Sequence, residues 1–363
     1  MKLARLRSSL ADQRSGLRQD YEDCSDWRRV PVRLSQFKVP PLEGAKWLQG
    51  GAMDVHALRG KRALLVDFWD YTCVNCIRTL PYIQQWHERY DKMGLTVVGV
   101  HSPEFAFAKS ADFVGSAVKR FGLTYPIAVD SDFAIWNAFE NKFWPAKYLV
   151  DRNGFVIYEH FGEGSYQQTE ELIQEALRPL NKGKEFPIPI APIREEDAEG
   201  SVCYPVSPEL YCGYKRGTLG NKSGYIRDSQ GDYKDPGMRR EEFLYLEGRW
   251  SATEEYVEFL GPRKDVEPYL AVRFKARGVN LVMSVSGRVP VELGVELDGS
   301  PPKKDEVGED VRLADGQAVV KIDEPRMYQL LMMPGVSEHE LRLKVKGKGL
   351  RAYAFTFTSC IAK

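Results

Sequence analysis

The stretch that decides the fold is Leu64-Leu65-Val66-Asp67-Phe68-Trp69-Asp70-Tyr71-Thr72-Cys73-Val74-Asn75-Cys76-Ile77-Arg78-Thr79-Leu80-Pro81. It opens with a short apolar run that ends at Trp69, which is typical of a buried strand. From Ile77 onward, large apolar residues recur at three- and four-residue steps, which predicts an amphipathic helix. Cys73 and Cys76 therefore lie where a strand is followed by the N-terminus of a helix.

That position favours thiol chemistry. The free N–H groups and the dipole of a first helical turn stabilise a thiolate, which is the form that attacks disulfides. The two-residue spacer places Cys76 one turn beyond Cys73, near enough to close a small ring. We therefore predict that Cys73 attacks a substrate disulfide, and that Cys76 resolves the mixed disulfide and releases the reduced substrate.

At these residues the chain resembles the thioredoxin superfamily. The run Asp67-Phe68-Trp69 is similar to thioredoxin's own strand, Asp67 matches the family's buried acid, and Pro81 matches the proline of its active-site helix. The longer pattern from Tyr71 to Tyr82 resembles the soluble C-terminal part of DipZ-type proteins, a redoxin branch related to TlpA-like thiol-disulfide proteins. The resemblance implies a thioredoxin-like α/β fold with a mixed sheet, and a protein-disulfide oxidoreductase.

The direction of the reaction is less defined than its class. The spacer Val74-Asn75 differs from the Gly-Pro of thioredoxin and from the Pro-His of strong oxidants, so the potential stays open. The resemblance and the buried acid favour a reductase. A carboxylate buried beside thiols should have a raised pKa, so we predict that Asp67 moves protons near neutrality.

A second segment carries the remaining predicted site. Phe143-Trp144-Pro145-Ala146 precedes a strand and a hairpin, and Pro145 matches the cis-proline of the superfamily, which faces the Cys pair. The alternative is an ordinary trans proline that opens an edge strand. Four residues are predicted to border the groove for a protein substrate: Trp69, Tyr71, Thr72 and Trp144. Arg78 is either a partner of the thiolate or a solvated surface charge.

The Cys pair could also serve three other functions. A zinc site needs four ligands and a second close pair of Cys or His, and no other Cys-x-x-Cys spacing exists in the chain. A peroxiredoxin-like peroxidase would have threonine three residues before the reactive cysteine, whereas that position is Asp70. A third alternative is a non-enzymatic protein that binds a glycan or a partner and uses the pair only as a structural disulfide. We expect no metal and no cofactor beyond the redox-active disulfide.

Composition limits the partners and the location. The 363 residues contain 51 Lys and Arg against 51 Asp and Glu. The net charge is therefore zero and does not favour nucleic acid as a partner. No apolar run is long enough for a transmembrane helix, and residues 1–7 lack the apolar core of a signal peptide, so the chain as written is expected to be soluble and cytoplasmic. The DipZ resemblance instead implies an extracytoplasmic protein with a thiol electron donor, such as a membrane-embedded CcdA-like protein.

The chain is predicted to have four parts: an N-terminal arm over residues 1–29, a thioredoxin-like domain over 30–182, a linker over 183–205, and a β-sandwich over 206–363. Within the second part, an added helix, strand and short helix over 113–139 are the insertion expected of TlpA-like redoxins. The linker is rich in proline and then acidic, which is typical of a semi-extended spacer. Cys24, in the arm, is interpreted as an incidental thiol.

In the last part, apolar residues alternate with polar ones, as in 281–285, 289–297 and 341–345, which predicts a β-sandwich of jelly-roll type. The blocks 207–214 and 246–250 resemble the C-terminal domain of DipZ-type proteins, which is similar to carbohydrate-binding modules. Candidate sugar-stacking residues are Trp250, Tyr256, Tyr269 and Tyr353, although aromatic residues of a sandwich mostly fill its core. Cys203 and Cys212 either form a structural disulfide or stay unpaired.

Overall fold

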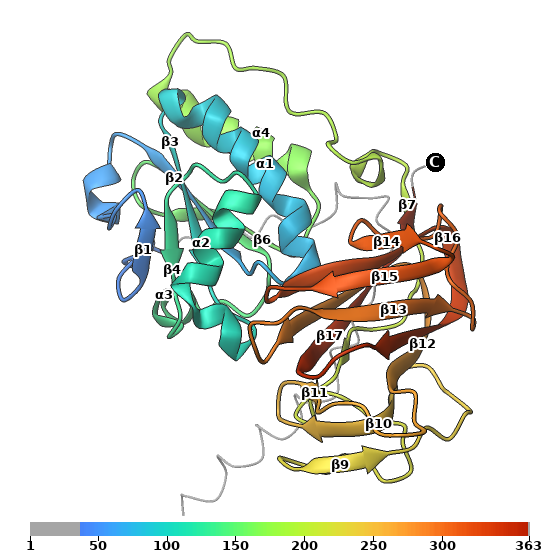
Figure 1. Cartoon of the computed structure of the whole chain (residues 1–363). Coiled ribbons are helices and arrows are strands. Elements are labelled where there is room, and N and C mark those ends of the chain that lie inside the picture. The colour runs from blue at the N-terminus through green and yellow to red at the C-terminus, as the bar shows by residue number, and fades with distance from the viewer. Residues whose placement is uncertain (1–36, 362–363) are drawn as a thin grey trace, which may run out of the picture. The chain divides into compact units, whose positions relative to one another are not determined.

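The computed structural model describes residues 37–361. The predicted arm and Cys24 lie outside the described residues. Six strands form a mixed sheet in the order β1-β4-β3-β2-β5-β6 (Figure 1). Their bounds are Lys46–Gln49 for β1, Ala63–Trp69 for β2, Leu95–His101 for β3, Ile127–Val129 for β4, Ala146–Val150 for β5 and Val156–Phe161 for β6. β2, β3 and β4 run parallel to one another, and the other pairings are antiparallel.

The helices are α1 Val74–Tyr90, α2 Ala111–Arg120, α3 Ala134–Ala138 and α4 Tyr166–Leu177. Short 3-10 turns add η2 Val55–Leu58, η3 Asp91–Met93, η4 Ala106–Lys109 and η5 Arg178–Leu180. The predicted thioredoxin-like fold is therefore confirmed, including the inserted α2, β4 and α3. The first helix starts at Val74 rather than at the predicted Ile77, because Cys73 caps its N-terminus.

β2 is central in the sheet and buried along its whole length, which explains its apolar run. Its side chains alternate between the two faces of the sheet. Leu65 and Trp69 share a core with α1, α2 and α4, whereas Val66 and Phe68 share a core with α3. The carboxyl end of β2 therefore delivers the chain directly to the N-terminus of α1.

The C-terminal region is all-β, as predicted, and the pairings between its strands are antiparallel. Its strands are β7 Val202–Cys203, β8 Leu210–Tyr211, β9 Gln230–Tyr233, β10 Leu244–Ala252, β11 Val257–Phe259, β12 Tyr269–Val285, β13 Val291–Leu297, β14 Val311–Ala314, β15 Gln317–Ile322, β16 Arg326–Val345, β17 Leu350–Thr358 and β18 Cys360–Ile361. β8 to β17 form one ten-stranded sheet, in which β12 pairs with β10 through its first residues and with β17 through its last. The predicted alternation is borne out in β13, where Val291, Leu293, Val295 and Leu297 are buried.

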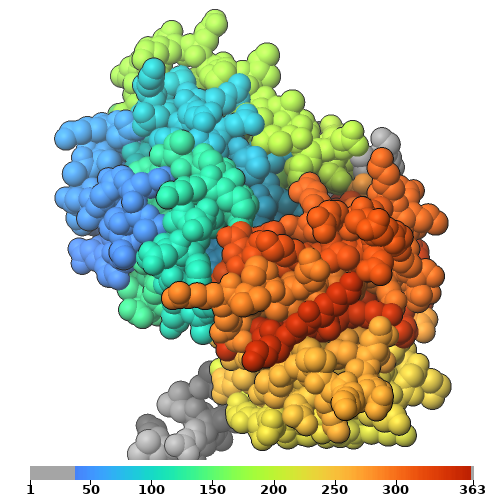
Figure 2. Space-filling model, viewed as in Figure 1, coloured from blue at the N-terminus to red at the C-terminus, as the bar shows by residue number. Residues whose placement is uncertain are grey.

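Between η5 and β7, the only regular element is the short 3-10 turn η6, Glu195–Asp197. We call residues 187–197 the strap. Side chains of α1 and α4 bind its backbone: Gln174 donates to the carbonyl of Pro187, Arg89 donates to that of Ile188, Glu170 accepts the N–H of Ile190, and Tyr82 accepts that of Ile193. In Figure 2 the yellow-green surface of this part of the chain borders the blue surface of the first domain. The predicted spacer is thus fixed against the helices.

Glu170 is the main anchor of the strap. It is buried, and its carboxylate accepts hydrogen bonds from Trp86 at 3.1 Å, Arg89 at 2.7 Å, Tyr90 at 2.6 Å and the N–H of Ile190 at 2.8 Å. Removing this carboxylate would leave the Arg89 charge without its partner, and it would leave the other three donors without their acceptor. Breaking a buried ion pair from one side is strongly destabilising.

We expect Glu170→Ala to lower the free energy of unfolding by about 3–5 kcal/mol. Urea unfolding of the full chain, followed by tryptophan fluorescence, measures this loss. Glu171→Ala is the matched control, because Glu171 is the exposed neighbour on the same helix. Equal losses in the two variants would contradict the anchoring role of Glu170.

Candidate active site

The two cysteines of α1 differ in exposure and in their contacts. Cys73 is the N-cap residue and is half-buried, and its Sγ accepts the backbone N–H of Cys76 at 3.3 Å. Cys76 is fully buried. Neither of the two is in a disulfide bond in this structure. A backbone N–H that points at the Cys73 sulfur stabilises negative charge on it. The more accessible of the two sulfur atoms is therefore also the one whose thiolate has a hydrogen-bond donor.

Burial raises the pKa of the Cys76 thiol well above its ordinary value, and the neighbouring Cys73 and Asp67 add to this rise. A thiol with a raised pKa does not ionise readily in neutral solution. Cys76 can therefore act as a nucleophile only if a base nearby accepts its proton.

Asp67 is the candidate for such a base. It lies in β2 between Leu65 and Trp69, on the face that α1 covers, and it is fully buried. Within residues 37–361, neither oxygen of its carboxyl group has a hydrogen-bond partner. Burial without such partners raises the pKa of Asp67 to about 7, although the charge of Lys147 opposes the rise.

Lys147 is a site residue that the sequence analysis missed. It lies directly opposite Asp67 in the antiparallel β2–β5 ladder and is fully buried. Its Nζ donates a hydrogen bond to the carbonyl of Gly162 at 3.2 Å. Burial lowers the pKa of Lys147 to about 8, while Asp67 and Cys76 act in the opposite direction. One signal could have revealed it, since a lysine in an otherwise apolar central strand is rare unless it has a charged partner.

The predicted cis-proline is present. The peptide bond between Trp144 and Pro145 is cis, and the carbonyl of Pro145 accepts the N–H of Gly162 at 2.8 Å. Trp144 remains partly exposed, and its indole N–H donates to the carbonyl of Ser102 at 2.9 Å. Of the four predicted groove residues, only Trp144 has an exposed surface of any size.

The structure corrects the placement of the other three. Trp69, Tyr71 and Thr72 are at most 1 % exposed, so they do not border an open groove. The Tyr71 ring stacks on His101 with 5.4 Å between ring centroids, and the Phe107 ring contacts it edge-on with 6.3 Å between centroids. Thr72 donates its hydroxyl to Asp70 at 2.6 Å, which fixes the turn before Cys73. Their burial depends on residues far along the chain, which the local pattern does not reveal.

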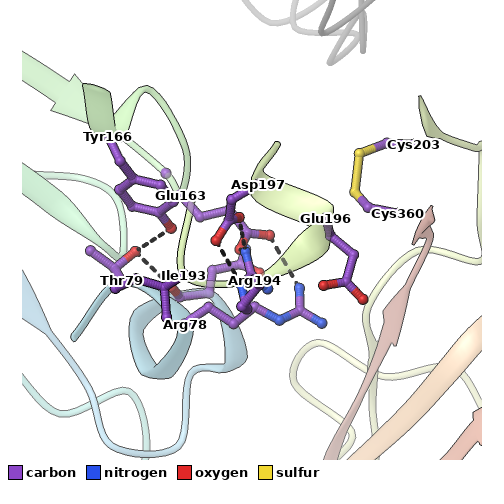
Figure 3. Close-up of polar contacts among 12 residues, drawn as sticks. Arg78, Thr79, Glu163, Tyr166, Ile193, Arg194, Glu196, Asp197, Cys203 and Cys360 are labelled. Carbon is purple, nitrogen blue, oxygen red and sulfur yellow. Dashed lines mark hydrogen bonds and ion pairs between the residues drawn. A yellow bond between two sulfur atoms is a disulfide. The ribbon is translucent and has the colours of Figure 1, made fainter. Parts of the chain in front are cut away.

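Arg78 is neither a partner of the thiolate nor a free surface charge. It forms an ion pair with Glu163 at 3.2 Å, and Glu163 also pairs with Arg194 of the strap at 3.3 Å (Figure 3). Arg194 in turn bonds Asp197, and Asp197 accepts the hydroxyl of Tyr82 at 2.9 Å. Arg78 and Tyr82 therefore connect the first turns of α1 to the strap.

Two expectations for the C-terminal region are corrected. Trp250 and Tyr353 are buried, so they cannot form a sugar-stacking platform, and only Tyr256 and Tyr269 of the four candidates keep partial exposure. Cys203 does not pair with Cys212, because its disulfide partner is Cys360. Cys212 is buried with a free thiol. In the described part of the chain, no group of three or more His, Cys, Asp or Glu side chains is placed to hold a metal ion.

Comparison with known families agrees with this geometry. Residues 38–177 match the family described as Redoxin, and residues 207–358 match the family described as thioredoxin-like C-terminal domain. The chain thus contains one region similar to redoxins and a second similar to thioredoxin-like C-terminal domains. The Cys73–Cys76 site lies within the first match, and the Cys203–Cys360 disulfide lies just outside the second match.

Individual relatives extend the comparison. The chain is 30 % identical to Protein DipZ of Mycobacterium bovis over 326 residues, which are 88 % of this chain and 42 % of that protein. It therefore spans less than half the length of this relative. It is 29 % identical to the thiol-disulfide oxidoreductase YkuV of Bacillus subtilis over 139 residues, which are 38 % of this chain and 93 % of that protein.

Among solved structures, a thioredoxin-like protein in the oxidized form is 29 % identical to this chain. The match covers 41 % of this chain and 99 % of that protein, with a TM-score of 0.37.

Among residues 37–361, no helix has the length and apolar character needed to span a membrane.

The contacts of Lys147 lead to a prediction about Asp67. Because the charge of Lys147 lowers the pKa of Asp67, Lys147→Met should raise that pKa above about 7, by roughly one unit or more. NMR titration of the Asp67 side-chain carboxyl carbon measures the shift. Lys142→Met is the matched control, because Lys142 is an exposed lysine in the preceding loop. An unchanged Asp67 titration in Lys147→Met would contradict the coupling of the two groups.

Proposed function

We propose that the chain is a thiol–disulfide oxidoreductase that reduces disulfide bonds in proteins through Cys73 and Cys76. The observation that supports this most directly is the arrangement of three groups at one helix N-terminus. Cys73 is half-buried with a backbone donor on its sulfur, Cys76 is buried one turn further along α1, and Asp67 is buried on the sheet face that α1 covers, without a hydrogen-bond partner.

In the first step, the Cys73 thiolate attacks one sulfur of the substrate disulfide. A bond forms between Cys73 and that sulfur, the substrate disulfide bond breaks, and the other substrate sulfur leaves as a thiolate that takes up a proton. The backbone N–H of Cys76 stabilises the attacking sulfur before the step.

In the second step, Asp67 in its charged form accepts the proton of Cys76, and the Cys76 thiolate attacks Cys73. The Cys73–Cys76 disulfide forms, the bond between Cys73 and the substrate sulfur breaks, and that sulfur leaves as a thiolate that takes up a proton. Two electrons have then passed from the enzyme to the substrate. A pKa of about 7 suits Asp67 to this task, because it is ionised often enough near neutrality to accept a proton and then to return it.

The direction and the partners are part of the proposal. A buried acid with a pKa near neutrality suits repeated thiol reduction, so we favour reductase over oxidase. A thiol donor must then restore the dithiol after each cycle, and a membrane-embedded CcdA-like protein is the candidate that the DipZ resemblance offers. The Cys203–Cys360 disulfide supports an oxidising, extracytoplasmic compartment. Binding of carbohydrate by the C-terminal domain stays a prediction.

Single cysteine variants test the assignment of roles. Cys73→Ser should abolish the reduction of insulin by the full chain with a dithiol donor. Cys76→Ser should stop turnover after the first step and accumulate a mixed disulfide at Cys73, which mass spectrometry detects. Cys212→Ser is the control, because the buried Cys212 thiol should not matter. Full activity in Cys73→Ser would disprove the proposal, and rapid turnover of hydrogen peroxide by the wild type would favour the peroxidase alternative.

The role of Asp67 predicts a pH dependence. In the wild type, the resolving step should accelerate as the pH rises through about 7, because only the charged carboxyl group accepts the Cys76 proton. Asp67→Asn should slow this step at pH 7 by about a hundredfold and remove the inflection. Stopped-flow measurement of the decay of the mixed disulfide at several pH values checks this, with Asp132→Asn, a change at an exposed aspartate, as the control.

A stability measurement separates proton transfer from a purely structural role. The pKa of Asp67 is raised from 3.8 to about 7 on folding, so its contribution to stability is fully present below about pH 4 and is lost as the pH rises toward 7. At pH 8, Asp67→Asn should therefore be more stable than the wild type by about 2–4 kcal/mol, and the difference should vanish near pH 4. If Asp67→Asn slowed the resolving step but was less stable than the wild type at pH 8, this result would contradict the proton-transfer role of Asp67.

A further inference from the structure

The Cys203–Cys360 disulfide lies apart from the main sheet of the C-terminal region. Cys203 in β7 and Cys360 in β18 face each other directly in a two-stranded antiparallel ladder, which is not joined to the ten-stranded sheet. Figure 3 shows the disulfide beside the strap, near Glu196. Opening this bond would therefore disturb two rungs of a separate ladder rather than the sheet itself.

The core of the C-terminal region does not depend on this bond. Its main apolar cluster is built by residues from Leu210 to Phe355, and the match to the thioredoxin-like C-terminal family covers residues 207–358. Both cysteines lie outside these ranges. A disulfide that opens without unfolding a core is able to exchange in the native protein.

The two sulfur atoms of this bond are in different surroundings. Cys203 is exposed, whereas Cys360 is half-buried. The Sγ of Cys360 lies 3.7 Å from the Ser359 hydroxyl oxygen, and the carbonyl of Cys360 accepts a hydrogen bond from the Arg277 guanidinium at 3.0 Å. A hydroxyl donor and a cation beside Cys360 would stabilise a thiolate there, and a stabilised thiolate leaves faster.

Arg277 has two further contacts. Its guanidinium donates to the carbonyl of Met333 at 3.0 Å and forms an ion pair with Glu196 of the strap at 2.7 Å. Glu196 therefore offsets part of the positive charge that Cys360 experiences. The balance between Arg277 and Glu196 should set how readily Cys360 departs as a thiolate.

We propose that Cys203–Cys360 is a second redox-active disulfide, with Cys203 as the sulfur that is attacked and Cys360 as the leaving sulfur. A thiolate of a dithiol protein attacks Cys203, a mixed disulfide forms, and Cys360 leaves as a thiolate that takes up a proton. The second thiol of the reductant then loses its proton and attacks the first sulfur of the reductant, which is bonded to Cys203. The bond to Cys203 breaks, and the Cys203 sulfur leaves and takes up a proton. The reductant ends as a disulfide, and the chain gains two thiols.

The test uses the full chain with Cys73→Ser and Cys76→Ser, so that the site of the proposed function plays no part. Dithiothreitol serves as the probe in native buffer, and mass spectrometry after alkylation assigns the state of each cysteine. The expected result is reduction of Cys203–Cys360 much faster than global unfolding, with unchanged near-UV circular dichroism. Reduction only at the rate of global unfolding would overturn this proposal. That result would leave the proposed function of Cys73 and Cys76 untouched.

Charge variants in the same background test the assigned leaving sulfur. Arg277→Gln should slow reduction and Glu196→Gln should accelerate it, each by roughly 2- to 10-fold. A purely structural role predicts that both changes loosen the strap and therefore change the rate in the same direction. A further Cys360→Ser change should leave Cys203 free to form a stable mixed disulfide with glutathione. Rate changes of the same sign, or failure to form this adduct, would also overturn the proposal.

Discussion

Side chains alternate between the two faces of a strand, and this alternation in β2 and β5 is the constraint on which the site depends. Val66 and Phe68 pack toward α3, so Asp67 must face α1. Lys147 lies opposite Asp67 and faces the same side. A slip of one residue in either strand would turn the charged group of that strand to the opposite face, away from Cys76.

This placement explains why two groups with distant ordinary pKa values titrate close together. Burial favours the neutral form of each group, and it moves Asp67 up from 3.8 to about 7 and Lys147 down from 10.5 to about 8. Their mutual attraction limits both shifts. The pair therefore gives up or accepts a proton near neutral pH at little cost in free energy, which is what a buried thiol such as Cys76 requires of its surroundings.

The local features of the site could be predicted from the sequence, whereas its distant contacts could not. The apolar run of β2, the cysteines at the start of α1 and the cis bond at Pro145 all have signals within a few residues. The burial of Tyr71 depends on Phe107, which lies in a different segment. The partner of Cys203 lies 157 residues away, and the spacing of cysteines alone does not fix their connectivity.

The strap shows a property of the linker that its composition did not reveal, namely its hydrogen bonds to the helices. Prolines lack an N–H, so a proline-rich segment has few donors to satisfy and can lie extended on a surface. Here the N–H groups of Ile190 and Ile193 reach Glu170 and Tyr82, which are fixed in the helices. Tyr82 belongs to α1, whose N-terminus carries Cys73. The segment that joins the two domains therefore also restrains the helix that stabilises the attacking sulfur.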